Sequence, residues 1–220
     1  MSKNGLKRLS TALAAAVAGV LLLAPTAHAA TTAGVQQVQP GSVKAGAQYL
    51  QRGLTAVRFD PAVAAAHGFK IITLPDGSQQ SVPVNPKDHR KPSPPIKAPR
   101  PGSVTPNVAS DTEYGDCGYS FIEGDVVGTH TIYLRSGFGI SPDRPTAVGY
   151  NWSIALYDDN GVSYQGASGG LEFRSSWSGE WDDLTQYGTS LDDVTDFSDA
   201  VLYDGTVCGS YGPFITLYPG

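Results

Sequence analysis

Hydrophobic and polar residues alternate with a period of two over much of the second half of the chain. Residues 150–157 read YNWSIALY, so every second side chain is large and apolar. Residues 129–135 (THTIYLR) and 171–177 (LEFRSSW) follow a similar alternation. Because successive side chains of a β-strand point to opposite faces, each run predicts a strand with one apolar face.

Turn signals separate these runs. Asn160-Gly161 is a dipeptide that two-residue hairpin turns prefer, and Asp204-Gly205 joins two further apolar runs. Additional strands are expected at 119–123 and 214–218, giving about six to nine short strands and no long helical pattern. We therefore predict that residues 111–220 form an all-β domain, an antiparallel β-sandwich with a barrel as the alternative.

The preceding segment, residues 30–84, has a less regular pattern and is predicted to be less structured than the β-domain. Residues 43–57 carry apolar side chains at irregular helical spacing, and Asp60-Pro61 before an alanine-rich stretch predicts a short helix ending at Gly68. Residues 70–84 predict a hairpin around a turn at 75–78. A lone hairpin is marginal in water, so we expect this segment to pack weakly against the β-domain or to be partly disordered.

Residues 85–110 are predicted to form a proline-rich basic linker. Eight prolines occur from Pro83 to Pro106, interleaved with lysines and arginines. This proline density favours an extended, semi-rigid spacer over a packed core. A solvated linker is the simplest interpretation, and a basic tether for anionic cell-wall polymers or a proline-motif ligand is the sharper alternative.

Residues 1–29 have the pattern of a secretory signal peptide of bacterial type. Three basic residues precede an apolar run over 9–23, and Ala27-His28-Ala29 fits an A-x-A cleavage site. The sequence therefore predicts a secreted, extracellular protein with no membrane span. Export would place both cysteines in an oxidising compartment, and two cysteines allow one intramolecular pairing, a Cys117–Cys208 disulfide.

Charge is distributed unevenly along the chain. Residues 1–106 hold 12 Lys/Arg and 3 Asp/Glu, whereas residues 107–220 hold 3 Lys/Arg and 17 Asp/Glu, a net charge of −14. Nucleic-acid binding depends on basic side chains that neutralise phosphate, so the charge of this half argues against nucleic acid or an anionic membrane surface as its partner. Cations, basic proteins and neutral sugars remain compatible with it.

The acidic residues suggest two kinds of site. Asp192, Asp193 and Asp196 are candidate calcium ligands, because an extracellular domain meets calcium and carboxylate oxygens bind it. Glu180 with Asp182 or Asp183 is a candidate carboxylate pair for glycoside hydrolysis. A solvated acidic face that aids solubility is the simpler interpretation of both sets.

Two tryptophans suggest a binding platform. Trp177 and Trp181 frame Ser178-Gly179-Glu180, a spacing that predicts a turn with two neighbouring indoles. Exposed aromatic rings suit the faces of sugars and protein hot spots, so Trp177, Trp181 and Glu180 are candidate ligand-binding residues. The period of two places Trp177 on the same strand face as Phe173, which favours the other interpretation, in which Trp177 belongs to the core.

One serine lies in a motif typical of catalytic nucleophiles. Gly166-Ala167-Ser168-Gly169-Gly170 matches the G-x-S-x-G pattern of α/β-hydrolases, but the last histidine, His130, precedes the serine and excludes that arrangement. His130, Asp158 and Ser168 follow the His-Asp-Ser order of chymotrypsin-like proteases, whose triad lies between two β-barrels. The three residues span only about 40 positions, which is too few to build two barrels. The motif is therefore interpreted as a glycine-rich turn.

Together these features predict a secreted, non-enzymatic binding module for carbohydrate or the cell envelope. The first alternative is a protein-interaction or inhibitor module that uses its acidic face against a basic secreted partner. The second alternative is a small secreted hydrolase. Calcium is the cofactor that the acidic residues allow.

Overall fold

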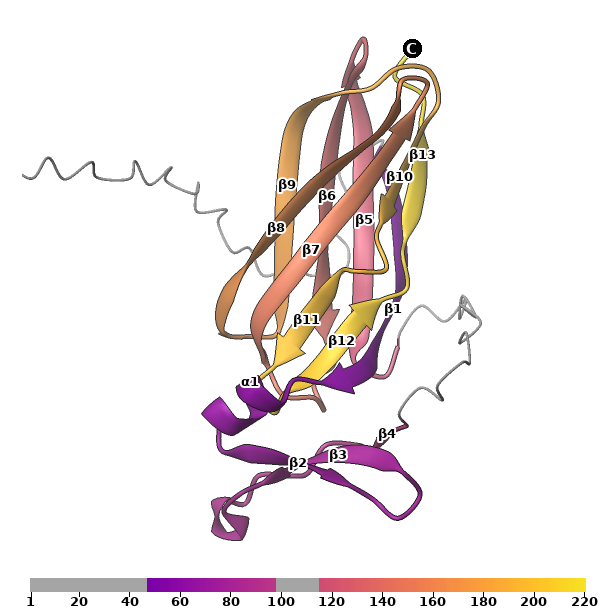
Figure 1. Cartoon of the computed structure of the whole chain (residues 1–220). Coiled ribbons are helices and arrows are strands. Elements are labelled where there is room, and N and C mark those ends of the chain that lie inside the picture. The colour runs from indigo at the N-terminus through magenta and orange to yellow at the C-terminus, as the bar shows by residue number, and fades with distance from the viewer. Residues whose placement is uncertain (1–46, 98–114) are drawn as a thin grey trace, which may run out of the picture. The chain divides into compact units, whose positions relative to one another are not determined.

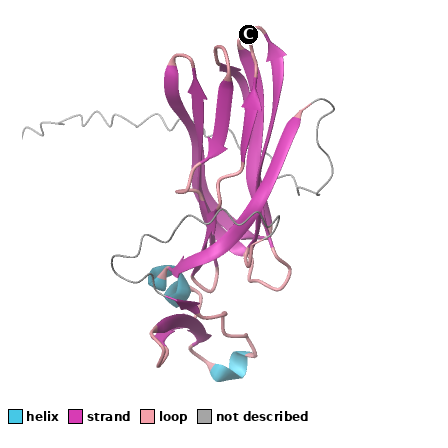
Figure 2. Ribbon diagram, turned by 90° about the vertical axis from the view of Figure 1, so that its right-hand side faces the viewer, coloured by secondary structure: helices cyan, strands magenta, loops and turns pink. Residues whose placement is uncertain are grey.

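The computed structural model describes residues 47–97 and 115–220, and most of these residues lie in β-strands. Helix is confined to α1 (Pro61–Ala66) and the 3-10 helix η1 (Pro86–Asp88), drawn in cyan in Figure 2. Within these ranges no helix has the length and apolar character needed to cross a membrane. The predicted signal peptide and the second half of the proline-rich linker lie outside the described residues.

Ten strands form one antiparallel sheet. Hydrogen bonding follows the order β13-β10-β7-β11-β12-β1-β5-β6-β9, and β8 pairs with β7 beside this path. Among the described strands, β9 pairs with β6 but not with β8 or β13, so the sheet does not close into a barrel. The ten strands are β1 (Gln48–Phe59), β5 (Gly118–Gly128), β6 (Thr131–Ile140), β7 (Ala147–Asp158), β8 (Gly161–Arg174), β9 (Ser176–Thr185), β10 (Ser190–Val194), β11 (Asp199–Leu202), β12 (Thr206–Ser210) and β13 (Phe214–Leu217).

The sheet folds over so that two layers enclose the core. In Figure 1, β8, β7, β11 and β12 cross in front of β9, β6 and β5. The Trp152 ring on β7 lies 5.4 Å from Phe138 on β6 and 6.1 Å from Trp177 on β9. The indole N–H of Trp152 donates to the Ser136 hydroxyl at 2.9 Å, which satisfies its polar group inside the core. The predicted all-β antiparallel sandwich is confirmed.

Strand β1 corrects the prediction of helical spacing over 43–57. It pairs with β5 through Gln48–Leu54 and with β12 through Leu54–Phe59, so both of its edges are hydrogen-bonded. This segment was expected to lie outside the β-domain, yet it lies between strands of its sheet. The neighbouring strands override the weak local helical preference, which Gly53 lowers further.

The predicted disulfide is confirmed, and it spans β1. Cys117 precedes β5 and Cys208 lies on β12, with Cα atoms 6.0 Å apart and 91 residues of sequence separation. The backbone N–H of Cys117 bonds to Leu54, and Cys208 is paired with Ala56 in the β1–β12 ladder. The bond therefore links the two strands that flank β1.

A second, three-stranded sheet contains β2 (Phe69–Thr73), β3 (Ser78–Pro83) and β4 (Ile96–Lys97). The hairpin predicted over 70–84 is confirmed as β2 and β3, and α1 begins as expected with Asp60 as its N-cap. Because β4 pairs with β3, the end of the described proline-rich stretch belongs to a sheet. The Ser81 hydroxyl donates to the Asp204 carbonyl at 2.6 Å, joining this sheet to the β11–β12 turn.

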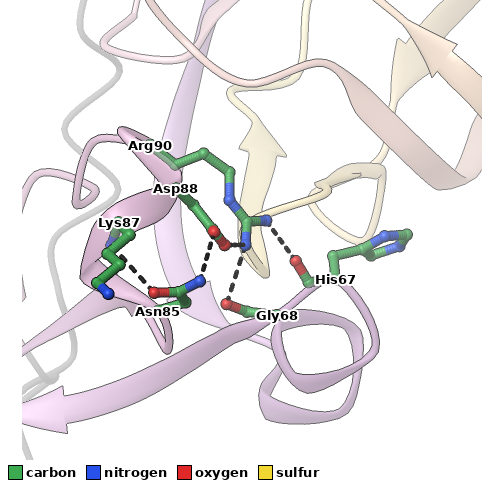
Figure 3. A network of polar contacts seen from close by, with 6 residues as sticks. All are labelled: His67, Gly68, Asn85, Lys87, Asp88 and Arg90. Carbon is green, nitrogen blue, oxygen red and sulfur yellow. Dashed lines mark hydrogen bonds and ion pairs between the residues drawn. The ribbon is translucent and has the colours of Figure 1, made fainter.

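Arg90 holds the chain after η1 against the start of β2. Its guanidinium donates to the His67 carbonyl at 2.6 Å and pairs with the Asp88 carboxylate at 2.7 Å, as Figure 3 shows. The same group lies 4.5 Å from the centre of the Phe69 ring. The contacts of Arg90 with the buried Phe69 ring and with the oxygens of His67 and Asp88 therefore hold this irregular segment in place, which has little regular hydrogen bonding of its own.

The strand predicted over 171–177 is two strands. β8 ends at Arg174 and β9 begins at Ser176, where the chain passes from one layer to the other. Phe173 has a φ of 53° and is 58% exposed, although alternation predicted that it faces inward. This left-handed residue breaks the period of two, so Phe173 and Trp177 face different surroundings.

Candidate binding surface

The two tryptophans predicted to form a platform lie on the inner face of β9. Trp177 is 4% exposed and stacks on Tyr150 with ring centroids 4.2 Å apart, and Trp181 is half-buried against the same core. Both indoles pack over Gly179, where a Cβ would lie within 3.0 Å of each ring. The prediction of neighbouring indoles is confirmed, but the turn predicted between them is wrong because residues 177–181 lie within β9. The prediction of an exposed platform is also wrong, because alternation along this strand turns both indoles inward. Glu180 faces away from them and is exposed.

The three candidate calcium ligands do not converge. Asp192 and Asp193 are successive residues of β10, so their side chains leave the sheet on opposite faces. Asp192 is fully buried between Leu156 and Ile215, its partners in the neighbouring strands. In the described residues, no group of three or more His, Cys, Asp or Glu side chains is placed to hold a metal ion. The predicted calcium set is therefore not assembled.

Instead, Asp192 belongs to a buried polar cluster. Its carboxylate accepts hydrogen bonds from the Gln186 amide at 2.8 Å and from the Ser190 hydroxyl at 2.9 Å, and Ser190 also contacts Gln186. Burial raises the pKa of Asp192 to about 6 despite these bonds. Burial and nearby Asp196 likewise raise the pKa of Asp193 to about 6, and its buried Oδ1 lacks a hydrogen-bond partner. Both carboxyls therefore take up protons in mildly acidic solution.

The candidate hydrolytic carboxylates lie along one exposed strand. Glu180, Asp182 and Asp183 are all exposed, and Asp183 adopts a φ of 55° where β9 slips its register against β6. Burial, followed by the charge of Glu180, raises the pKa of neighbouring Tyr133 to about 12. None of the three carboxylates lines the hollow described below.

The serine motif also lies in a strand. Gly166–Gly170 is part of β8, paired with β7, so its interpretation as a turn is wrong. Ser168 pairs with Asn151, which lies seven residues from Asp158 along β7, a distance of about 23 Å. Asp158 accepts hydrogen bonds from the backbone N–H groups of Asn160 and Tyr187. The His130–Asp158–Ser168 combination does not form a triad.

Exposed large side chains gather on the outer face of β8, β7, β10 and β13. Tyr157 stands opposite Val162 on one side and Leu191 on the other, and Ala155 stands opposite Tyr164 and Asp193 in the next row. Directly paired residues share a face, so these rows form one surface about 14 Å wide across four strands. We call it the outer aromatic face and define it by Tyr157, Val162, Tyr164, Leu191 and Phe214, which are 38–62% exposed.

A hollow of about 380 Å³ lies on this face between β7 and β8. It exists because Gly166 has no side chain to fill the space between Tyr164 and Ser168, its neighbours on the same face of β8. A Cβ on Gly166 would lie 2.8 Å from the Trp152 carbonyl oxygen, so the close strand approach favours glycine here. The volume is at the lower end of the range for small-molecule sites.

The lining of the hollow is polar but carries no charge. By alternation, the side chains that share the face of the hollow are those of Asn151 and Ser153 on β7 and of Tyr164 and Ser168 on β8. They offer a phenol ring, one amide and two serine hydroxyls. Beside it, the Asn151 amide donates to the Phe197 carbonyl at 3.4 Å, which places the loop carrying this 80%-exposed phenylalanine next to the hollow. The lining residues are Asn151, Trp152, Ser153, Tyr164, Gln165, Gly166, Ala167 and Ser168.

The sequence analysis missed this surface, although two signals pointed to it. The run 150–157 ends in Tyr157 on its polar face, and a glycine within a strand, such as Gly166, marks a close backbone approach. Neither signal identifies which strands are neighbours. The comparisons with protein families, with curated proteins and with solved structures found no match.

Proposed function

We propose that this protein is an exported, non-enzymatic binding module that attaches to neutral carbohydrate of a cell envelope through the outer aromatic face. The observation that carries this proposal is the gathering of exposed rings on one face of a hydrogen-bonded sheet. Flat rings with polar edges suit the apolar faces of pyranose sugars, and the sheet holds the rings at fixed spacing.

Export is supported by two features. Residues 1–29 have the order of basic, apolar and small residues that signal peptides share. The Cys117–Cys208 disulfide is of the kind that persists in oxidising compartments. A sugar-binding role outside the cell also agrees with the acidic second half, because neutral polymers need no basic surface.

A sedimentation assay tests the proposal. The secreted chain is mixed with isolated cell walls, insoluble β-glucan, chitin or starch, and the bound fraction is measured after pelleting. We expect wild type to pellet with at least one polymer, and Tyr157→Ser with Phe214→Ser to lower its affinity roughly tenfold. The control, Val126→Ser with Val127→Ser on β5, changes side chains of similar exposure outside this face.

Two results would contradict the proposal. The first is that wild type pellets with none of the four probes. The second is that pelleting is abolished in about 0.5 M salt and is the same for both double variants, because screening removes charge contacts and leaves apolar stacking in place. The second result would favour the acidic-face module instead.

A further inference from the structure

We infer that the hollow over Gly166 is a binding subsite for one uncharged sugar ring of a polysaccharide. This inference rests on the proposed function and adds where the ring sits and which polymers are rejected. It combines the missing side chain at Gly166, the Tyr164 ring and the amide and hydroxyl groups that surround them.

The shape of the hollow suits a ring stacked on tyrosine. Tyr164 is 62% exposed, so its face is available to a ligand. The space beside it is open because Gly166 interrupts the row of side chains between Tyr164 and Ser168. A pyranose ring packed against the phenol would cover apolar surface on both partners, which favours association.

The polar groups match the edge of a sugar. On the face of the hollow, Asn151 carries an amide with two donors and an acceptor, and Ser153 and Ser168 each carry a hydroxyl that donates and accepts. Gln165 stands opposite Ile154, so its side chain leaves β8 on the other face. Sugar hydroxyls are themselves donors and acceptors, so this set can pair with neighbouring hydroxyls in several orientations. The Asn151 amide also reaches the Phe197 carbonyl, which holds it at the rim.

The charge of the lining selects against ionic sugars. Residues 107–220 carry 17 acidic side chains, yet none of the eight lining residues is charged. A uronic acid would meet no basic partner in the hollow and would approach a strongly negative domain. An amino sugar would find no carboxylate within the lining to pair with its ammonium group. Desolvating either charge without a partner is costly, so a neutral ring is the preferred occupant.

Isothermal titration with soluble oligosaccharides tests the subsite. The probes are neutral cellohexaose and chitohexaose, acidic oligogalacturonate and cationic chitosan hexamer. Wild type is expected to bind at least one neutral probe roughly tenfold or more tightly than both charged probes. Tyr164→Ala and Ser168→Leu are each expected to weaken that binding about tenfold, the first by removing the stacking ring and the second by filling the hollow.

Two matched controls keep the test specific. Ser163→Leu makes the same change on the other face of β8, and Tyr218→Ala removes a 68%-exposed tyrosine that does not line the hollow. Both are expected to leave affinity within about twofold of wild type. Thermal unfolding of each variant identifies any that fail to fold.

The outcomes separate this inference from the proposed function. The subsite inference is overturned if Ser168→Leu binds like Ser163→Leu while Tyr157→Ser with Phe214→Ser loses binding, and the aromatic-face proposal then survives. Equal affinity for neutral and charged probes also overturns the inference. If neither soluble nor insoluble carbohydrate binds wild type, both proposals fail together.

Discussion

Strand β7 carries aromatic residues on both of its faces, with different consequences. On its inner face Trp152 is 1% exposed and packs with Phe138 and Trp177, whereas on its outer face Tyr157 is 42% exposed. The two residues are five positions apart on one strand and belong to the same chemical class. The comparison teaches that burial separates the aromatic residues that stabilise this protein from those that are available to bind. Substitutions on the two faces should therefore affect different measurements.

Removing the disulfide should produce the largest loss of stability while leaving the outer face chemically intact. Cross-linking residues 91 positions apart lowers the entropy of the unfolded chain, an effect worth about 4.5 kcal/mol in the chain-closure model. We expect Cys117→Ala with Cys208→Ala to lower the free energy of unfolding by up to this amount, measured by urea denaturation. An unchanged denaturation midpoint would contradict this expectation.

Trp152→Ala tests the inner face directly. Truncation of a buried tryptophan leaves a cavity and typically costs about 3–5 kcal/mol, and here it also removes the donor to Ser136. Chemical denaturation should show a loss of about 4 kcal/mol. The matched change, Tyr157→Ala, should cost much less, and the comparison breaks if the two losses are equal.

The pH dependence of stability should report the buried carboxyl of Asp192. Its pKa is about 6 in the folded protein, above the ordinary value of 3.8, so the folded state binds more protons between these values. Its contribution to stability is therefore fully present below pH 3.8 and is lost as pH rises through about 6. The expected change is on the order of 2–3 kcal/mol.

Asp192→Asn isolates this contribution. Unfolding free energies of wild type and variant, measured from pH 4 to pH 7, should differ by a pH-dependent amount that favours the variant progressively at higher pH. The control is Asp143→Asn, which replaces an exposed aspartate outside the buried cluster. A constant difference between wild type and Asp192→Asn across this range would show that Asp192 does not titrate as expected.

The smallest expected effect on stability comes from the outer face. Tyr164→Ala should change the free energy of unfolding by less than about 0.5 kcal/mol, because surface substitutions away from packed features seldom cost more. The same variant should bind carbohydrate about tenfold more weakly in the titration described above. A loss of several kcal/mol would mean that the outer ring is structural, and the distinction between the two faces would fail.

Local sequence features predicted much of this fold correctly. The alternation in 150–157, the Asn160-Gly161 and Asp204-Gly205 turns and the Asp60 cap each act over a few residues, and each lies in the expected element. The pairing of the two cysteines followed from their number. Residues 43–57 could not be placed in the same way, because their strand is stabilised by β5 and β12, which follow it by more than 50 residues.

The candidate site was harder to predict for the same reason. Trp177 and Trp181 were identified as neighbours, but their inward direction depends on which layer β9 covers. The sequence predicted that Asp192 and Asp193 bind one metal ion together, but as successive residues of β10 they lie on opposite faces of the sheet. The hollow needs Gly166 on one strand and Ser153 on the next, and only the register of β7 against β8 brings them together.

The sequence by itself determined the all-β class, the Asn160-Gly161 and Asp204-Gly205 turns, the disulfide partners and the excess of acidic residues in the second half, because these depend on local geometry, on the cysteine count or on composition. Tertiary structure decided the central place of β1, the inner position of the tryptophans and the outer aromatic face with its hollow. The physical reason is that strand pairing joins residues far apart in the chain. Such pairing sets which face of each strand is dry, and no short stretch of sequence contains that information.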